Sequence, residues 1–195
     1  MTTASIPADP AAQRLAAVRD AMRRAARLTD RSADDIRLIA VSKTHDADAI
    51  RPLIAAGQRV FGENRVQESQ QKWPALREEQ GDIALHLVGQ LQSNKAAEAV
   101  ALFDVIHGLD RPSLLTALAR AMDGAGRRVP CFIQVNIGAE EQKGGCPIAD
   151  TPALIAAARD ADIPILGLMC VPPADVEPAP FFALLAKMAR EEGLE

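Results

Sequence analysis

The chain has 195 residues, of which 48% are hydrophobic and 25% are charged, so it contains enough apolar material for one sizeable core. Its formal net charge of -4 provides no broad cationic field, and nucleic acid is therefore not expected as a partner. The three cysteines are widely spaced and form no Cys-x-x-Cys pair, which argues against a disulfide framework and a zinc site.

The hydropathy pattern excludes two further classes. No apolar stretch approaches the roughly 20 residues that cross a bilayer. The first residues lack the basic-then-apolar pattern of a secretory signal. We therefore expect a cytoplasmic protein without a membrane partner.

The first 31 residues predict a helix that packs on the outside of the domain, because Leu15, Val18, Met22 and Leu28 recur at roughly helical spacing. After this helix, apolar β-like runs alternate with helical patterns. The predicted strands are residues 36–43, 59–63, 83–89, 104–108, 129–137 and 163–171. The predicted helices are residues 47–56, 66–79, 93–102, 112–122, 151–160 and 179–192.

This alternation indicates an α/β fold with a parallel sheet and right-handed crossovers. The sheet is either open and doubly wound or closed into a (βα)8 TIM-type barrel. The sequence shows only about six βα units, whereas a closed barrel of eight occupies about 250 residues. If the fold is a barrel, the last two βα units are absent from residues 1–195, which we expect to form a single domain.

The most informative residue is Lys43, which ends the apolar run 36–42. A buried parallel strand that turns polar at its carboxyl end has reached the edge where α/β proteins bind ligands. An amine beside apolar walls loses its proton more readily, which makes it a nucleophile for an aldehyde. The alternative is a rim lysine that forms a salt bridge with the next loop.

A second segment, Phe-Gly-Glu-Asn-Arg-Val-Gln-Glu at 61–68, follows the next predicted strand. Its glycine permits a tight turn that directs Glu63 and Asn64 inward, where an amide can hydrogen-bond a phenolic or carbonyl oxygen. Alternatively, Asn64 caps the following helix and Gln67 completes a capping box. Both roles can coexist.

His86 lies within an apolar strand, as either a core residue with satisfied hydrogen bonds or a functional one. If every strand delivers its last residues to one rim, the polar side chains at the strand ends meet at the edge where barrel enzymes place their chemistry. The residues predicted there are Lys43, Thr44, Glu63, Asn64, His86, His107, Asp110, Asn136 and Met169.

Several motifs, in conserved order and spacing, resemble the YggS/PROSC family of pyridoxal 5′-phosphate (PLP) homeostasis proteins. They are Ala-Val-Ser-Lys-Thr at 40–44, Phe-Gly-Glu-Asn at 61–64, His-Leu-Val-Gly at 86–89, Gln-Ser-Asn-Lys at 92–95 and Gly-Leu-Met at 167–169. The resemblance runs from about residue 36 to the end. It includes Asn136-Ile137 followed by Lys143 and Gly144.

The resemblance implies a barrel similar to the N-terminal domain of alanine racemase, with PLP carried as a Schiff base on Lys43. It also implies that Asn64, His86 and Met169 contact the cofactor. The implied function is PLP homeostasis inside the cell with little or no catalysis, so no catalytic residue and no metal ligand is assigned. The implied partners are PLP itself and apo PLP-dependent enzymes as candidate recipients, and we expect a monomer.

The sequence departs from the family in two places. Arg65 stands where the family usually has tyrosine. Family members also continue past residues 193–194 into segments that resemble the phosphate and pyridine-nitrogen contacts of the cofactor. Either these 195 residues are part of a longer chain, or cofactor binding is impaired; if the 195-residue form is the whole protein, we expect it to hold PLP weakly.

Two enzymatic alternatives remain. A PLP-dependent amino-acid racemase on this scaffold needs two bases, usually a lysine and a tyrosine. The chain contains no tyrosine, so His86 or His107 would have to be the second base. The other alternative is a cofactor-free Schiff-base aldolase. Lys143 is either a second amine for aldehyde binding or a solvated loop lysine.

Overall fold

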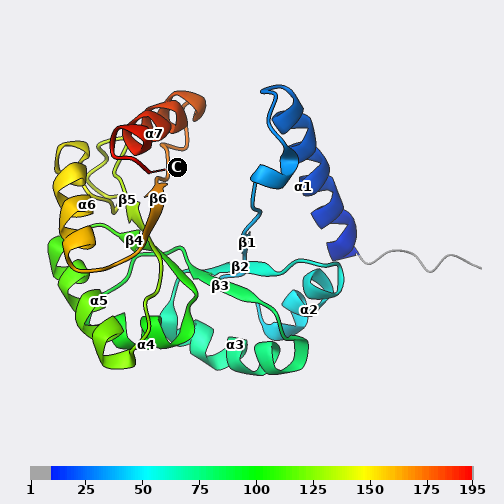
Figure 1. Cartoon of the computed structure of the whole chain (residues 1–195). Coiled ribbons are helices and arrows are strands. Elements are labelled where there is room, and N and C mark those ends of the chain that lie inside the picture. The colour runs from blue at the N-terminus through cyan, green and yellow to red at the C-terminus, as the bar shows by residue number, and fades with distance from the viewer. Residues whose placement is uncertain (1–9, 195) are drawn as a thin grey trace, which may run out of the picture. The chain divides into compact units, whose positions relative to one another are not determined.

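The computed structural model describes residues 10–194 and confirms the predicted alternation of strands and helices (Figure 1). The strands are parallel, in chain order, and comprise β1 (Ala40–Val41), β2 (Val60–Glu63), β3 (Ala84–Leu87), β4 (Val105–Leu109), β5 (Cys131–Gln134) and β6 (Ile165–Met169). The α-helices are α1 (Pro10–Arg27), α2 (Ala47–Ala55), α3 (Val66–Gln80), α4 (Ala96–Leu102), α5 (Pro112–Ala125), α6 (Thr151–Asp160) and α7 (Ala179–Glu191). Short 3₁₀ helices are η1 (Ala33–Asp35), η2 (Ser93–Lys95) and η3 (Ile148–Asp150).

The described residues form two compact units. The first unit contains residues 10–62 and 71–84, and the second contains residues 63–70 and 85–194. That the chain forms a single domain stays a prediction. Within residues 10–194, none of the helices combines the length and the apolarity needed to cross a bilayer.

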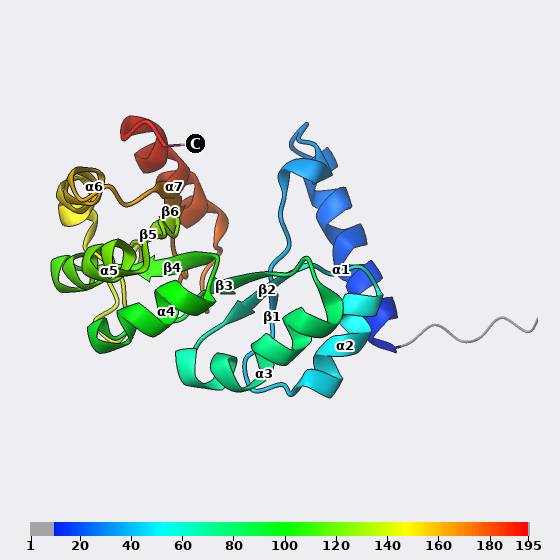
Figure 2. The same ribbon diagram turned by 60° about the horizontal axis from the view of Figure 1, so that its bottom comes forward.

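In the first unit, β1 pairs in parallel with β2, so that Ala40 lies opposite Phe61 and Val41 opposite Gly62. The Phe61 ring packs against Trp73 of α3 at a centroid distance of 5.1 Å, and both side chains are fully buried. Figure 2 shows α1 beside α2 and the segment that leads into β1. The N-terminal helix was predicted over residues 1–31, of which residues 1–9 lie outside the described part.

The first strand is shorter and more exposed than predicted. Residues 36–39 are not part of the ladder, because the side chain of Gln58 takes the place of a strand partner: its Nε2 donates to the carbonyls of Leu38 at 2.9 Å and Val60 at 2.7 Å. Val41 is 50% exposed. A strand buried on both faces was expected, but within the described residues β1 has a neighbouring strand on one side only.

The second unit carries β4–β6 and all of β3 except Ala84, and its helices α4, α5 and α6 cover one face of these strands (Figure 1). Helix α5 begins with proline and ends at Gly126, whose φ of 59° gives the left-handed C-terminal cap. Its apolar stripe is fully buried at Leu114, Leu118 and Met122. This packing stiffens the strands and so fixes the positions of the residues at their carboxyl ends.

Candidate functional site

Lys43 lies in the first unit, in the turn between β1 and α2. The ladder continues one residue past β1, because the Ser42 N–H donates to the Gly62 carbonyl at 2.9 Å. The ammonium of Lys72 then holds the turn by donating to the carbonyls of Ser42 at 2.9 Å and His45 at 2.8 Å. Lys43 itself is exposed, and its ammonium has no hydrogen bond or ion pair within residues 10–194. The salt-bridged alternative for Lys43 is therefore not what the structure shows.

The residue after Lys43 carries backbone strain. Thr44 has a φ of 65°, an uncommon conformation for a β-branched residue, which costs about 1–3 kcal/mol. Its hydroxyl donates to the Lys43 carbonyl at 2.6 Å. Strain of this kind is typical of ligand sites, and here it fixes the direction in which the chain presents Lys43.

Asn64 lies in the second unit between β2 and α3, where it is half-buried. The chain leaving β3 passes directly against it: a Cβ on Gly89 would lie 2.5 Å from the Asn64 carbonyl oxygen. The predicted capping box is not formed, because α3 begins at Val66 and the Asn64 side chain makes no hydrogen bond within the described residues. The Asn64 amide is therefore not committed to the helix.

His86 is buried in β3 and forms a pair with His107 of β4, with Nδ1 of His86 2.9 Å from Nε2 of His107. One ring nitrogen donates and the other accepts, so the tautomers of the two rings are coupled. The His107 ring also stacks on Phe132 at a centroid distance of 4.5 Å. Burial, with a smaller contribution from the charge of His86, lowers the pKa of His107 from 6.5 to about 4. His107 is thus neutral at pH 7.

Met169 ends β6 and lies opposite Gln134 of β5, so the two side chains project from the same face of the sheet. Nε2 of Gln134 donates to the Gly144 carbonyl at 3.1 Å, whereas its buried Oε1 has no hydrogen-bond partner within the described residues. A Cβ on Gly108 would lie 2.8 Å from the Gly89 carbonyl oxygen and 3.6 Å from Oε1 of Gln134, so the chain after β3 packs closely against β4 here. An unpartnered buried acceptor fits a ligand that carries a donor group.

The other residues of the predicted rim have structural roles. Asp110 forms an ion pair with Arg111 at 2.6 Å. Asn136 hydrogen-bonds the backbone of Glu140 in both directions and so folds the loop after β5. Glu63 is fully buried.

Lys143 is neither a solvated lysine nor an available amine. It is half-buried, and its ammonium contacts the Glu140 carboxylate at 2.6 Å and donates to the Pro172 carbonyl at 3.0 Å. These contacts tie the loop after β5 to the chain that follows β6.

Within the second unit, the structure brings together His86 and His107, places Met169 beside Gln134, and sets Gly89 against Asn64. Sequence reasoning missed two residues, Gln134 beside Met169 in the second unit and Lys72 beside the turn of Lys43 in the first unit. Gln134 had a detectable signal, since it is a polar residue at the end of an apolar strand. Lys72 had none, because nothing in a surface-helix pattern indicates that its ammonium reaches the turn around Lys43.

Comparison with known proteins assigns the chain to a family. Residues 14–190 match the family described as alanine racemase, N-terminal domain. The pyridoxal phosphate homeostasis protein of Escherichia coli (strain K12) is 39% identical over 183 residues, which cover 91% of this chain and 77% of that protein.

Two solved structures are similar to this chain in fold. PipY of Synechococcus elongatus, in its structure with PLP bound, has a TM-score of 0.72 and 37% identity, covering 88% of this chain and 83% of PipY. Alanine racemase of Clostridium difficile 630 has a TM-score of 0.66 at 13% identity, covering 83% of this chain and 44% of that enzyme, and shows the fold alone.

The parallel strands and the family match therefore define a protein of the alanine racemase barrel class, of which the described residues supply six parallel strands. The chain belongs to the alanine racemase N-terminal domain family, together with the pyridoxal phosphate homeostasis proteins. The predicted fold class is confirmed.

Proposed function

We propose that this chain binds PLP and takes part in PLP homeostasis, with Lys43 as the residue that binds the cofactor covalently. The observation that carries the proposal is the PLP-bound structure of PipY, which is 37% identical to this chain. The name of the Escherichia coli relative supports the same role. When bound, the cofactor supplies an aldehyde that a lysine amine captures in a reversible covalent bond.

The environment of Lys43 suits this capture. Its amine is exposed and is not engaged by other described residues, so no existing interaction must be broken. The turn that carries it is held on one side by the Ser42 hydrogen bond to Gly62 and on the other by Lys72. A nucleophile on a rigid turn needs no backbone rearrangement before it reacts.

We also propose that Asn64, His86 and Met169 contact the cofactor. The Asn64 amide can donate to a phenolic oxygen, and the thioether of Met169 can pack on an aromatic ring. The pairing of His86 with His107 fixes the orientation of the His86 imidazole. The unpartnered Oε1 of Gln134 fits a donor group in the same unit.

We further propose that the protein has little or no catalytic activity. The relatives are named homeostasis proteins. The chain has no tyrosine to serve as a second base. The pKa of about 4 makes His107 a poor base at neutral pH, where an efficient base has a pKa near the working pH. Apo PLP-dependent enzymes as recipients, a monomeric state and a cytoplasmic location stay predictions.

The racemase alternative is tested by solvent exchange. The protein is loaded with PLP and incubated with single enantiomers of amino acids in deuterated water. We expect no sustained exchange of the α-proton above the rate with free PLP. Exchange that proceeds over many turnovers and is lost in His86→Gln would establish the racemase instead.

The PLP-binding proposal is tested by the visible absorbance of bound PLP when the chain is titrated with PLP, with free PLP at the same concentration as the blank. We expect the band to be present for the unmodified chain, lost in Lys43→Ala and retained in Lys187→Ala, which removes an exposed lysine of α7. Equal bands in both variants would show that another residue binds the cofactor.

A further inference from the structure

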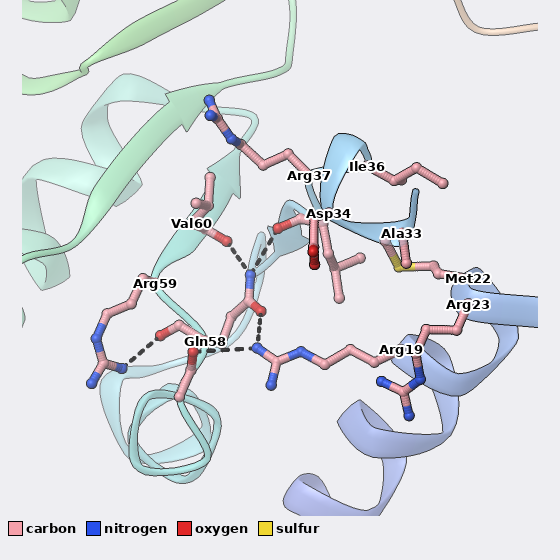
Figure 3. A pocket seen from close by; sticks show the side chains of 12 residues that line it. Arg19, Met22, Arg23, Ala33, Asp34, Ile36, Arg37, Gln58, Arg59 and Val60 are labelled. Carbon is pink, nitrogen blue, oxygen red and sulfur yellow. Dashed lines mark hydrogen bonds between the residues drawn. The ribbon is translucent and has the colours of Figure 1, made fainter. Parts of the chain in front are cut away.

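A cavity of about 400 Å³ lies in the first unit, between α1 and the segments that precede β1 and β2 (Figure 3). Residues 36–38 line it and come before β1, whereas Lys43 comes after β1. The cavity is therefore at the opposite end of this strand from the lysine. Its volume lies within the range of small-molecule sites, about 300–1,000 Å³.

The cavity lining is strongly cationic. It contains Arg19, Arg23, Arg37 and Arg59, and a single acidic residue, Asp34. This excess of positive charge occurs in a chain whose net charge is -4. A concave surface with arginines of this density attracts anions from solution.

Two of these arginines are oriented by neutral groups. Arg19 reaches from α1 towards Gln58, as Figure 3 shows, and donates to the Gly57 carbonyl at 3.2 Å and to Oε1 of Gln58 at 3.1 Å. Arg59 donates to the carbonyls of Ile54 at 2.7 Å and Gln58 at 3.0 Å. Carbonyl and amide oxygens fix the position of a guanidinium without cancelling its charge.

The centre of this arrangement is rigid. Gln58 is 3% exposed, and its Nε2 is held by the carbonyls of Leu38 and Val60. Its Oε1 is therefore presented in a fixed position to Arg19. The guanidinium of Arg19 is pre-organised in the same way as an arginine in a built anion site.

The remaining two arginines differ in their partners. Arg23 forms an ion pair with Asp20, its neighbour on α1. Arg37 is exposed and has no hydrogen bond or ion pair within residues 10–194. Arg37 can therefore bind an incoming anion without losing an existing contact.

We propose that this cavity binds a small phosphomonoester that also carries a hydroxyl or amine donor. The phosphate contacts the guanidinium of Arg19, and Arg37, whose side chain points away from Arg19 in Figure 3, must rotate to reach it; arginine has the planar geometry that matches a phosphate. Met22 and Ile36 provide an apolar wall for the carbon part of the ligand. The Asp34 carboxylate accepts the hydrogen bond from the donor. This site is independent of the proposed role of Lys43.

The test is titration calorimetry of the full chain with glycerol 3-phosphate at low salt, and with glycerol as the uncharged counterpart. We expect glycerol 3-phosphate to bind and glycerol not to bind. Arg37→Gln should weaken the Kd about tenfold, the usual effect of losing one charge-assisted hydrogen bond. Arg37 is exposed and has no hydrogen bond or ion pair to lose within the described residues, so we expect this variant to keep the fold.

The matched control is Arg120→Gln, which removes the same charge from an exposed position on α5. We expect it to change the Kd less than about twofold. We also expect Lys43→Ala to bind glycerol 3-phosphate normally, which separates this site from the PLP site. The proposal is overturned if glycerol 3-phosphate does not bind, if glycerol binds equally well, or if Arg37→Gln and Arg120→Gln weaken binding to the same extent.

Discussion

The buried histidine pair predicts a loss of stability in mild acid. The pKa of His107 is 6.5 in an unfolded chain and about 4 in the fold, because burial, and then the charge of His86, disfavour the imidazolium. Above pH 6.5 the ring is neutral in both states and the fold has its full stability. As the pH falls from 6.5 towards 4, the unfolded state binds the proton and the folded state does not.

The size of this effect follows from the two pKa values. At about 1.4 kcal/mol per pKa unit, the fall from 6.5 to about 4 corresponds to a loss of about 3 kcal/mol of unfolding free energy. A typical domain has about 5–15 kcal/mol in total. The effect is therefore a large part of the stability and is measurable.

The assay is urea unfolding between pH 7.5 and pH 4, followed by far-ultraviolet circular dichroism, which reports the helices of the second unit, where His107 lies. The unmodified chain and His45→Gln, which removes an exposed histidine, should show the same loss in acid. His107→Gln should show a loss smaller by about 3 kcal/mol. The same pH dependence in His107→Gln would refute the assignment, as would an NMR titration of the His107 ring near pH 6.5.

Three further predictions concern other parts of the fold. Gly89→Ala should destabilise the fold by about 1–3 kcal/mol, because its Cβ would lie 2.5 Å from the Asn64 carbonyl oxygen. Gly124→Ala in α5, whose Cβ would have nothing within 4 Å, should stabilise the fold by up to about 1 kcal/mol. Equal urea midpoints for the two variants would contradict this. Lys72→Met should cost about 1–3 kcal/mol by leaving two carbonyls of the turn after β1 without their donor, and it should weaken PLP binding more than an equally destabilising core variant. In the native protein, iodoacetamide should label the half-buried Cys170 well before the buried Cys131, because burial raises the pKa of the Cys131 thiol to about 12. Peptide mass analysis that finds the reverse order of labelling would contradict the burial of Cys131 in β5.

Most of the fold could be predicted from local patterns. The starts of α5 and α6 are marked by proline, and every predicted strand from 59–63 onward overlaps an observed one. Strands β2 to β5 are buried along most of their length and α5 and α6 bury one face, so the apolar pattern of these elements reflects their packing directly. The length of the first strand was overestimated. The side chain of Gln58 takes the place of a strand partner at Leu38, and this contact between residues distant in the sequence leaves no periodic signal.

The site was predicted in part. Lys43 could be identified because an apolar run ends at it, but the positive φ of Thr44 and the clamp by Lys72 depend on tertiary contacts that a sequence does not show. His86 was recognised as either a core or a functional residue, and the structure gives the partner that the sequence could not, His107. The roles of Lys43, Asn64, His86 and Met169 towards PLP stay predictions.

The role of Lys43 is tested most directly by adding PLP to the full chain, reducing with borohydride and mapping the modified peptide by mass spectrometry. We predict one reduced pyridoxyl group per chain, located on Lys43 and lost in Lys43→Arg. An adduct spread over several exposed lysines, or located on Lys143 in preference to Lys43, would contradict the assignment of Lys43 as the PLP-binding residue.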